Sequence, residues 1–430
     1  MSTALRIGLA GLGTVGAGVV ALLDANAALI ERRADRRIAV VAVSARDRAR
    51  ARGVDLARFE WIDDAGGLPA RDDVDVVVEL IGGADGPALT LARATLAAGK
   101  PFVTANKAML AHHGLELATL AEAHAVPLKY EAAVAGGIPV VKGLREGAAA
   151  NRLERIYGIL NGTCNYILSR MEAERLSFAA VLADAQTLGF AESDPSFDID
   201  GVDAAHKLSI LAAVAFGARI DFAGVAAEGI RRVELADIDY ASALGFRIRL
   251  VGLASADDGA MFQRVHPCLV PFAHPLAHVD GALNAVVAEG NFVGRLLFQG
   301  RGAGAGPTAS AVVADLIDIA RGEVGPAFAM PTARLQPLPP ADASAQVGRC
   351  YIRLTVADRI GVLAELTREL GDAGVSIESL IQRGTASDGE VYVVMVTHST
   401  VHGRVAAALA KIAASASVTA PPLMLHILDF

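Results

Sequence analysis

Cysteine, lysine and aromatic side chains are scarce in this chain of 430 residues, and no uncharged apolar run reaches the roughly 18 residues of a membrane span. This excludes a membrane protein. The three cysteines (Cys164, Cys268 and Cys350) have no CxxC spacing, so they indicate neither a disulfide framework nor a zinc motif and fit a reducing cytoplasm. The net charge of −8 argues against a nucleic-acid partner.

Lysine is rare in comparison with arginine. Of the 39 basic residues six are lysine. A protein that uses arginine so widely is expected to keep lysine where an ammonium group is needed, so these positions are the first candidates for chemistry. They are Lys100, Lys107, Lys129, Lys142, Lys207 and Lys411.

Short apolar strands alternate with helices over residues 1–137. The strands are predicted at 6–10, 38–44, 74–80, 101–104 and 127–131, and the helices at 15–29, 88–98 and 113–124. Each strand is a continuous apolar run, which is typical of a sheet covered on both faces. We therefore expect an α/β domain with a Rossmann-like, doubly wound parallel sheet.

The alternation loosens over residues 138–330, where we expect an α+β domain for catalysis and dimerisation. Strands are predicted at 153–160 and 262–270, helices at 177–188 and 204–216, and a helix at 309–321 is expected to return to the first domain. Residues 331–348, rich in proline and alanine, read as a linker. Residues 349–430 have the order βαββαβ of a small ferredoxin-like unit.

The first strand is followed by a glycine-rich turn. Residues 8–16 read GLAGLGTVG, so Gly11, Gly13 and Gly16 form G-x-G-x-x-G between a strand and a helix. Such glycines permit a tight turn, close approach of the backbone to a pyrophosphate, and close helix–strand packing. The pattern predicts a dinucleotide site. The alternative is an ordinary glycine-rich turn of an α/β protein.

The end of the second predicted strand bears on the choice of cofactor. NAD-binding enzymes usually place Asp or Glu there, whereas this chain has Ser44 followed by Arg46, Arg48 and Arg50. Arg46 is suited to a 2′-phosphate, so we expect NADP(H) to be preferred and NAD(H) to be possible. The alternative is a solvated basic turn.

Carboxylates are concentrated between residues 185 and 207, in AQTLGFAESDPSFDIDGVDAAHK. Asp203 and Lys207 are four residues apart and share one helix face. Reduction of a carbonyl needs a proton donor beside the oxygen, and Lys207 can supply it. The alternative is a solvated acidic loop with a surface ion pair. The acids are Glu192, Asp194, Asp198, Asp200 and Asp203.

The run A-x3-G-F-x-E-x-D-P-x2-D-I-x-G-x-D-x3-K over residues 185–207 resembles the signature of homoserine dehydrogenases. GLGTVG at 11–16, VTANKAML at 103–110, and YEAAVAGGIPV at 130–140 with ILNGTCNYIL at 159–168 resemble the same family. The resemblance implies the reversible, NAD(P)H-dependent reduction of L-aspartate 4-semialdehyde to L-homoserine, on the route to threonine, methionine and isoleucine.

The resemblance also implies roles for single residues. Lys207 would transfer the proton, Lys107 would lie beside nicotinamide and substrate, Glu192 would bind the amino group, and Asp198 and Asp203 would surround the substrate. The expected cofactor-binding residues are Gly11, Gly13, Thr14, Val15, Gly16, Arg46, Lys107, Gly189 and Gly304. The positions matching a sodium site of the family are Glu131, Val134, Gly136 and Ile138; a plain glycine-rich turn is the alternative.

The C-terminal unit resembles an ACT domain, a module that binds amino acids. The similarity lies in residues 350–382, with Asp358 to Leu363 as the strand-to-helix turn and Gly361 at the helix start. The resemblance implies feedback by L-threonine, with a purely oligomerising domain as the alternative. A homodimer or homotetramer is expected.

Two further functions remain open from the residues alone. One is another NAD(P)-dependent amino-acid dehydrogenase on the same scaffold, against which the 185–207 segment counts. The other is a non-catalytic sensor of NADPH and an amino acid, which the presence of Lys107, Glu192 and Lys207 disfavours. The histidines between His112 and His278 show no metal-ligand spacing and are interpreted as structural or surface residues.

Overall fold

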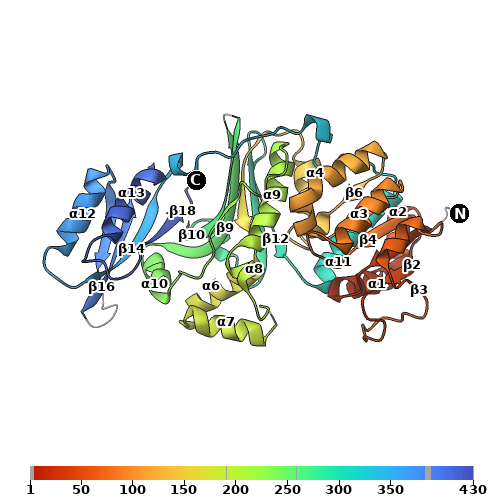
Figure 1. The fold of residues 1–430 in the computed structure, drawn as a ribbon, viewed down its shortest axis with the longest axis horizontal. Coiled ribbons are helices and arrows are strands. Elements are labelled where there is room, and N and C mark those ends of the chain that lie inside the picture. Colours follow the sequence, from red (N-terminus) through yellow and green to blue (C-terminus); the bar gives the residue numbers. More distant parts are fainter. Residues whose placement is uncertain (1–3, 190, 258, 383–388, 430) are drawn as a thin grey trace.

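The computed structural model describes residues 4–189, 191–257, 259–382 and 389–429. The molecule is elongated, with the N-terminal sheet at one end, a central sheet, and the C-terminal unit (residues 349–430) at the other end (Figure 1). Within the described residues no single helix is long and apolar enough to cross a membrane. The helices α1 (Thr14–Ala25) and α2 (Ala27–Ala34) meet that criterion only as a pair bent by 83°.

The N-terminal sheet has six parallel strands in the order β3-β2-β1-β4-β5-β6. The predicted doubly wound sheet is therefore confirmed, and the short strand β3 was not predicted because Glu60 and Trp61 form no apolar run. The strands are β1 (Leu5–Ala10), β2 (Ile38–Ser44), β3 (Glu60–Trp61), β4 (Val76–Glu79), β5 (Phe102–Thr104) and β6 (Leu128–Lys129).

Helices cover this sheet, and two of them differ from the sequence prediction. The helix predicted at 15–29 is divided at Asn26, whose backbone is not helical, into α1 (Thr14–Ala25) and α2 (Ala27–Ala34). The helix α4 (Lys107–Ala123) begins earlier than predicted because the Asn106 side chain accepts from Met109 N–H at 3.1 Å and caps it. The remaining helices here are α3 (Pro87–Ala97) and α11 (Ala305–Ala320), which packs against α1.

The central sheet and its helices follow the N-terminal domain in the chain. Helix α9 (Val202–Phe216) is buried along most of its length, with α4 on one side and strands of the central sheet on the other. The strands are β7 (Leu153–Ile159), β8 (Ala226–Ala227), β9 (Phe246–Asp257), β10 (Ala260–Pro271), β11 (Leu283–Gly290) and β12 (Gly294–Arg301). The helices are α5 (Val140–Lys142), α6 (Gly162–Glu174), α7 (Phe178–Thr187), α8 (Ser196–Ile199), α9 and α10 (Leu235–Ala243).

The C-terminal unit has the predicted order βαββαβ, with strand order β18-β14-β16-β15. Its strand β18 also pairs in parallel with β10, so the central and C-terminal strands form one ten-stranded sheet. Residues 331–348 are tied to both parts: Gln336 N–H donates to Gly217 O at 2.9 Å, and β13 (Val347–Gly348) pairs with β17 (Thr400–Val401). The elements are β14 (Cys350–Ala357), α12 (Val362–Asp372), β15 (Ile377–Gln382), β16 (Glu390–Thr397), α13 (His402–Ala413) and β18 (Leu423–Ile427).

Candidate active site

Lys207 lies on α9 in the wall of a cavity of about 900 Å³ between the N-terminal and central sheets. Its side chain is buried, and the ammonium Nζ donates to Leu160 O and to Asp203 Oδ2, both at 2.7 Å. An ammonium has three N–H donors, so these two bonds fix its direction and leave one donor for the cavity. The residue is thus a buried ammonium group held by two partners rather than a surface lysine.

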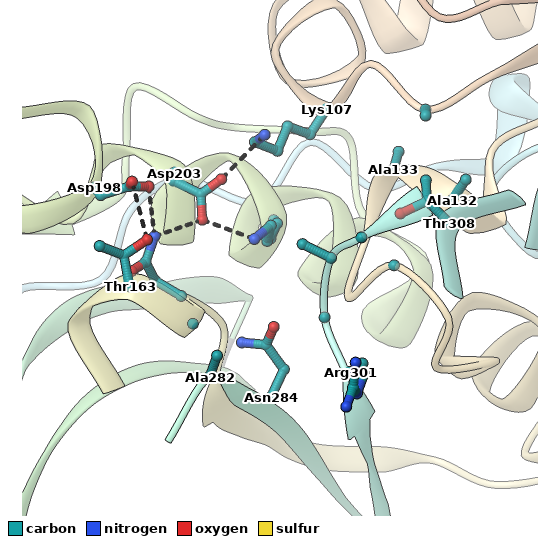
Figure 2. A pocket seen from close by; sticks show the side chains of 18 of the residues that line it. Lys107, Ala132, Ala133, Thr163, Asp198, Asp203, Ala282, Asn284, Arg301 and Thr308 are labelled. Carbon is teal, nitrogen blue, oxygen red and sulfur yellow. Dashed lines mark hydrogen bonds and ion pairs between the residues drawn. The ribbon is translucent and has the colours of Figure 1, made fainter. Parts of the chain in front are cut away.

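Asp203 is shared by two lysines. Its Oδ1 lies 3.1 Å from Lys107 Nζ, which comes from the first turn of α4, while Oδ2 binds Lys207 (Figure 2). Burial alone would raise the pKa of Asp203, but the ammonium groups of Lys207 and Lys107 outweigh it and hold the pKa well below its usual range. The carboxylate therefore stays charged and orients both ammonium groups, as the spacing of Asp203 and Lys207 indicated.

Asn161 holds the two cavity aspartates together. Its Nδ2 donates to Asp198 Oδ1 at 2.8 Å and to Asp203 Oδ2 at 2.9 Å, and its Oδ1 accepts from Cys164 N–H at the start of α6. Burial and the charge of Asp203 raise the pKa of Asp198. Asn161 lies in the ILNGTCNYIL run, but the sequence alone indicated no role for it.

The opposite wall comes from the start of β11 and from the segment that leads from β12 into α11. Asn284 of β11 lines the cavity there, together with Arg301 at the end of β12 and Thr308 of α11 (Figure 2). Gly302 is required in this segment because a Cβ at that position would lie 1.2 Å from Asn284 Oδ1. None of the three lining residues was singled out from the sequence, because all lie outside the motifs that carried the resemblance.

The glycine turn has the form expected of a dinucleotide site. A Cβ at Gly11 would lie 2.4 Å from Leu80 O, and one at Gly16 would lie 2.1 Å from Gly11 O, so neither position tolerates a side chain. Around Gly13 the space is open, with no described atom within 4 Å of a Cβ placed there. Thr14 and Val15 follow in the first turn of α1, whose N–H groups are available to an anion.

A second cavity, of about 660 Å³, adjoins this turn. Arg46 and Ser44 line it as expected, and Arg50 and Arg52 do so as well. Arg52 is held by its Nε, which donates to Leu12 O at 3.0 Å, and it was not named in the sequence analysis. The two cavities lie on either side of the start of α1, one lined by Gly11 and Gly13 and the other by Val15.

The structure brings most of the predicted site residues together. Glu192 is not among them: its side chain is exposed and does not line the large cavity. Thr14, Gly16, Glu131, Val134 and Ile138 line neither cavity. The predicted residues that line the large cavity are Val15, Lys107, Gly136, Gly189, Asp198, Asp203, Lys207 and Gly304.

Glu131, the carboxylate expected in a cation site, caps the short helix α5. Its oxygens accept from Val141 N–H at 2.9 Å and from Lys142 N–H at 2.8 Å. Burial, aided by the charge of Asp315, raises the pKa of Glu131 to about 7. Each carboxylate oxygen has a second lone pair, so the group can still bind a hard cation together with backbone carbonyls. The donor chemistry therefore fits such an ion.

Three features together define a dinucleotide-dependent oxidoreductase. They are the parallel sheet in the order β3-β2-β1-β4-β5-β6, the glycine turn whose Gly11 and Gly16 tolerate no side chain, and the cluster of Lys107, Asp203 and Lys207 in the large cavity. The comparisons with known proteins narrow this class. Family models described as "Homoserine dehydrogenase, NAD binding domain", "Homoserine dehydrogenase" and "ACT domain" match residues 11–131, 139–317 and 351–416.

Individual relatives agree with the family models. The chain is 44% identical to a homoserine dehydrogenase of Neisseria gonorrhoeae, over 98% of each chain. A crystal structure of the homoserine dehydrogenase from Thiobacillus denitrificans matches with a TM-score of 0.93 and 42% identity, over 99% of this chain and 98% of the other. A hyperthermophilic archaeal homoserine dehydrogenase in complex with NADPH matches at 25% identity and a TM-score of 0.63, over 73% of this chain and 97% of the other.

The chain belongs to the homoserine dehydrogenase family. The family expected from the 185–207 segment, the NAD(P)-dependent oxidoreductase activity and the ACT domain are thereby confirmed. Both alternative functions left open by the residues, a different amino-acid dehydrogenase and a non-catalytic sensor, are disfavoured by this agreement over the full length of the chain.

Proposed function

We propose that this chain catalyses the reversible reduction of L-aspartate 4-semialdehyde to L-homoserine with Lys207 as the group that transfers the proton. The observation that carries the proposal is the buried Lys207 ammonium, which lines the large cavity and is held by Leu160 O and Asp203 Oδ2. When bound, the nicotinamide supplies or accepts the hydride at the carbon that bears the oxygen.

The residues of this chain then handle the charge on that oxygen. As the carbonyl carbon gains hydride its oxygen becomes basic, and Lys207 Nζ donates a proton to it. Lys107, on the other oxygen of Asp203, stabilises the developing negative charge. In the reverse direction neutral Lys207 removes the proton from the alcohol. Asp203 and Asn161 do not contact the reacting atoms in this scheme; they position Lys207, Lys107 and Asp198.

The assay is the formation of NADPH from NADP⁺ and L-homoserine at alkaline pH. L-serine and L-threonine serve as matched hydroxy amino acids, because they test whether the cavity selects the terminal alcohol of homoserine. Turnover of L-homoserine far above both is the expected result. Equal turnover of all three would favour a different amino-acid dehydrogenase.

For the substrate's ammonium group we propose Glu192 and Asp198 as candidate partners. Glu192 is supported by the family resemblance, and Asp198 by its place in the cavity wall. The variants Glu192→Gln and Asp198→Asn separate the two, since the residue that binds the ammonium should raise the KM for L-homoserine when neutralised while the Kd for NADPH stays unchanged.

We propose further that NADP(H) is preferred and NAD(H) is accepted. The support is a second cavity with Ser44 at the end of β2 and the guanidinium groups of Arg46, Arg50 and Arg52 around it. Arginine binds phosphate through paired, charge-assisted hydrogen bonds, and a 2′-phosphate would meet these groups. The archaeal relative crystallised with NADPH is consistent with this choice.

We also propose that a sodium ion is bound by the carboxylate of Glu131 and by the backbone of Val134, Gly136 and Ile138. Its support is the buried carboxylate of Glu131 and the position of Gly136 in the cavity wall. Such an ion would hold the 134–138 turn against Gly302, whose carbonyl lies 2.4 Å from a Cβ placed on Gly136. Activity and melting temperature in Na⁺ compared with a tetraalkylammonium salt would test it.

Regulation is proposed to act through the C-terminal unit, with L-threonine as effector. We also propose that the chain is divided into domains at 1–137, 138–330 and 349–430, with 331–348 as the linker. It is proposed to form a homodimer or homotetramer and to be located in the cytoplasm. The location is supported by the three cysteines, all of which are free. Regulation is supported by the shared sheet, because β18 joins β10 to β14.

A further inference from the structure

Three sulfur and imidazole side chains meet where the C-terminal unit joins the central sheet. Cys350 begins β14, His402 begins α13, and His426 lies on β18 opposite Cys350. One ligand atom from each of them lies within 4.8 Å of those of the other two. The large cavity lined by Lys207 does not include them, so this cluster is separate from the proposed catalytic site.

Three of the four ring nitrogens of His402 and His426 lack hydrogen-bond partners among the described residues, and the fourth, His426 Nε2, contacts Arg264. Among the residues that the structure describes, both ring nitrogens of His402 and the Nδ1 of His426 are buried and unpaired. The Nδ1 of His266, on the adjacent strand β10, is in the same state, with its ring centre 4.8 Å from that of His426. His266 is only 7% exposed. Buried polar atoms are almost always paired, so several unpaired nitrogens at one place indicate a bound species.

We propose that Cys350, His402 and His426 bind a divalent transition-metal ion of the zinc class, beside the buried ring of His266. Thiolate sulfur and imidazole nitrogen are the ligands that Zn²⁺ takes in tetrahedral sites. The sequence does not indicate the site, because its ligands come from two strands and a helix that are far apart along the chain.

The packing suits such a site. Gly348 leaves room beside the cluster, since a Cβ there would lie 3.1 Å from His402 Nε2.

Arg264 is the group that opposes metal binding. Its Nη1 lies 2.5 Å from His426 Nε2. When His426 binds a metal through Nδ1, its proton resides on Nε2, so Arg264 must release this contact. Its positive charge also repels the ion. Replacing Arg264 by a neutral residue should therefore increase the affinity for metal, which a merely structural role of the histidines does not predict.

A bound ion would fix the point at which residues 331–348 enter the C-terminal unit. His402 N–H donates to Gln346 O at 2.8 Å, and the strand pair β13–β17 lies directly before His402. The ion would join β14, α13 and β18, and β18 in turn pairs with β10. It would act as a structural link between the connecting segment and the shared sheet.

The test uses the full chain, stripped with EDTA and titrated with Co²⁺, followed by competition with Zn²⁺. We expect one equivalent of Co²⁺ per chain with a thiolate-to-cobalt charge-transfer band. Cys350→Ser should remove the band, His402→Gln should weaken Co²⁺ binding by at least about tenfold, and Arg264→Gln should strengthen it. His398→Gln, an exposed histidine of the same unit, is the matched control and should bind as the wild type does.

Several outcomes would overturn the proposal. One is the absence of a charge-transfer band in the wild type; another is His402→Gln binding Co²⁺ as tightly as His398→Gln. Cys164, whose Sγ lies 3.3 Å from Asp198 O, is a thiol beside the cavity carboxylates, and a band that survives Cys350→Ser but is lost in Cys164→Ser would place the metal there instead. If Cys350→Ser fails to fold, the other two variants still test the site. His402→Gln should bind Co²⁺ more weakly than the wild type and Arg264→Gln more tightly.

Discussion

Lys207 Nζ and Asp203 Oδ2 lie 2.7 Å apart on successive turns of α9, and both side chains are buried in the wall of the large cavity. A buried ion pair is a costly arrangement unless each charge has further partners. Here Leu160 O binds the ammonium, while Asn161 and Lys107 bind the carboxylate. The pair is therefore held in one orientation, as a proton-transfer group requires.

Replacing Lys207 by methionine should remove the proton transfer and keep the shape of the side chain. We expect kcat to fall by about 10²- to 10⁴-fold, the usual contribution of a positioned general acid or base, with the Kd for NADPH unchanged. Steady-state kinetics and NADPH fluorescence titration measure the two quantities. Lys411→Met, at an exposed lysine of α13, is the control. Activity of Lys207→Met within a few-fold of that control would exclude the assignment.

Arg46→Ala should weaken the binding of NADPH much more than that of NADH. A charge-assisted hydrogen bond contributes about 1.5–3 kcal/mol, so the KM for NADPH should rise by roughly tenfold or more. Arg50 and Arg52 line the same cavity, and the combined variant should lose the preference further. Arg32→Ala, on the exposed face of α2, is the control. An unchanged ratio of the two KM values in all arginine variants would contradict a 2′-phosphate site here.

His206 should make the folded protein sensitive to acid. Burial, together with the charges of His112 and Lys107, lowers its pKa to about 4, against about 6.5 in an unfolded chain. As the pH falls from 7 to 4 the unfolded state takes up the proton first, so stability declines over this interval. His206→Phe retains the ring contact with Phe222. Between pH 7 and pH 4 this variant should lose about 1–3 kcal/mol less of its free energy of unfolding than the wild type does.

Urea unfolding at a series of pH values measures this effect. His398→Gln, which changes an exposed histidine, should leave the wild-type pH dependence intact. If His206→Phe and the wild type lose the same stability between pH 7 and pH 4, the buried imidazole is not the group responsible.

Arg353 of β14 and Asp237 of α10 form a buried pair between the C-terminal unit and the central part, with Nε 2.7 Å from Oδ1. Burial raises the pKa of Asp237 even though Arg353 acts in the opposite direction. Arg353→Met should leave the buried Asp237 carboxylate without a charge partner, bound only by Tyr351 Oη and Glu234 N–H, and destabilise the fold by about 3–5 kcal/mol. The double variant Arg353→Met/Asp237→Leu should recover most of this loss while responding less to L-threonine than the wild type. Additive losses in the double variant would show that the pair is not coupled.

The sequence predicted the parts of this molecule that depend on local pattern. The strand periodicity and the G-x-G-x-x-G turn were sufficient for the N-terminal sheet, and the four-residue spacing of Asp203 and Lys207 was sufficient for one half of the site. Asn161 could not be placed in the same way, because its role depends on the start of α6 meeting α8 and α9.

Other features depend on long-range contacts. The exposed position of the Glu192 side chain could not be read from the motif that contains it. The division at Asn26 was missed because the apolar pattern continues through it. The cluster of Cys350, His402 and His426 arises from strand pairing and helix packing within the C-terminal unit, so its members show no ligand spacing along the chain.

The pairing of β18 with both β10 and β14 has a practical consequence. A chain shortened before Leu423 would leave two unpaired strand edges in the middle of the large sheet, and such edges readily pair with other molecules. Removing the ACT region would thus expose β10 and favour aggregation. The proposed regulation is therefore better tested through point substitutions on the C-terminal unit than through truncation.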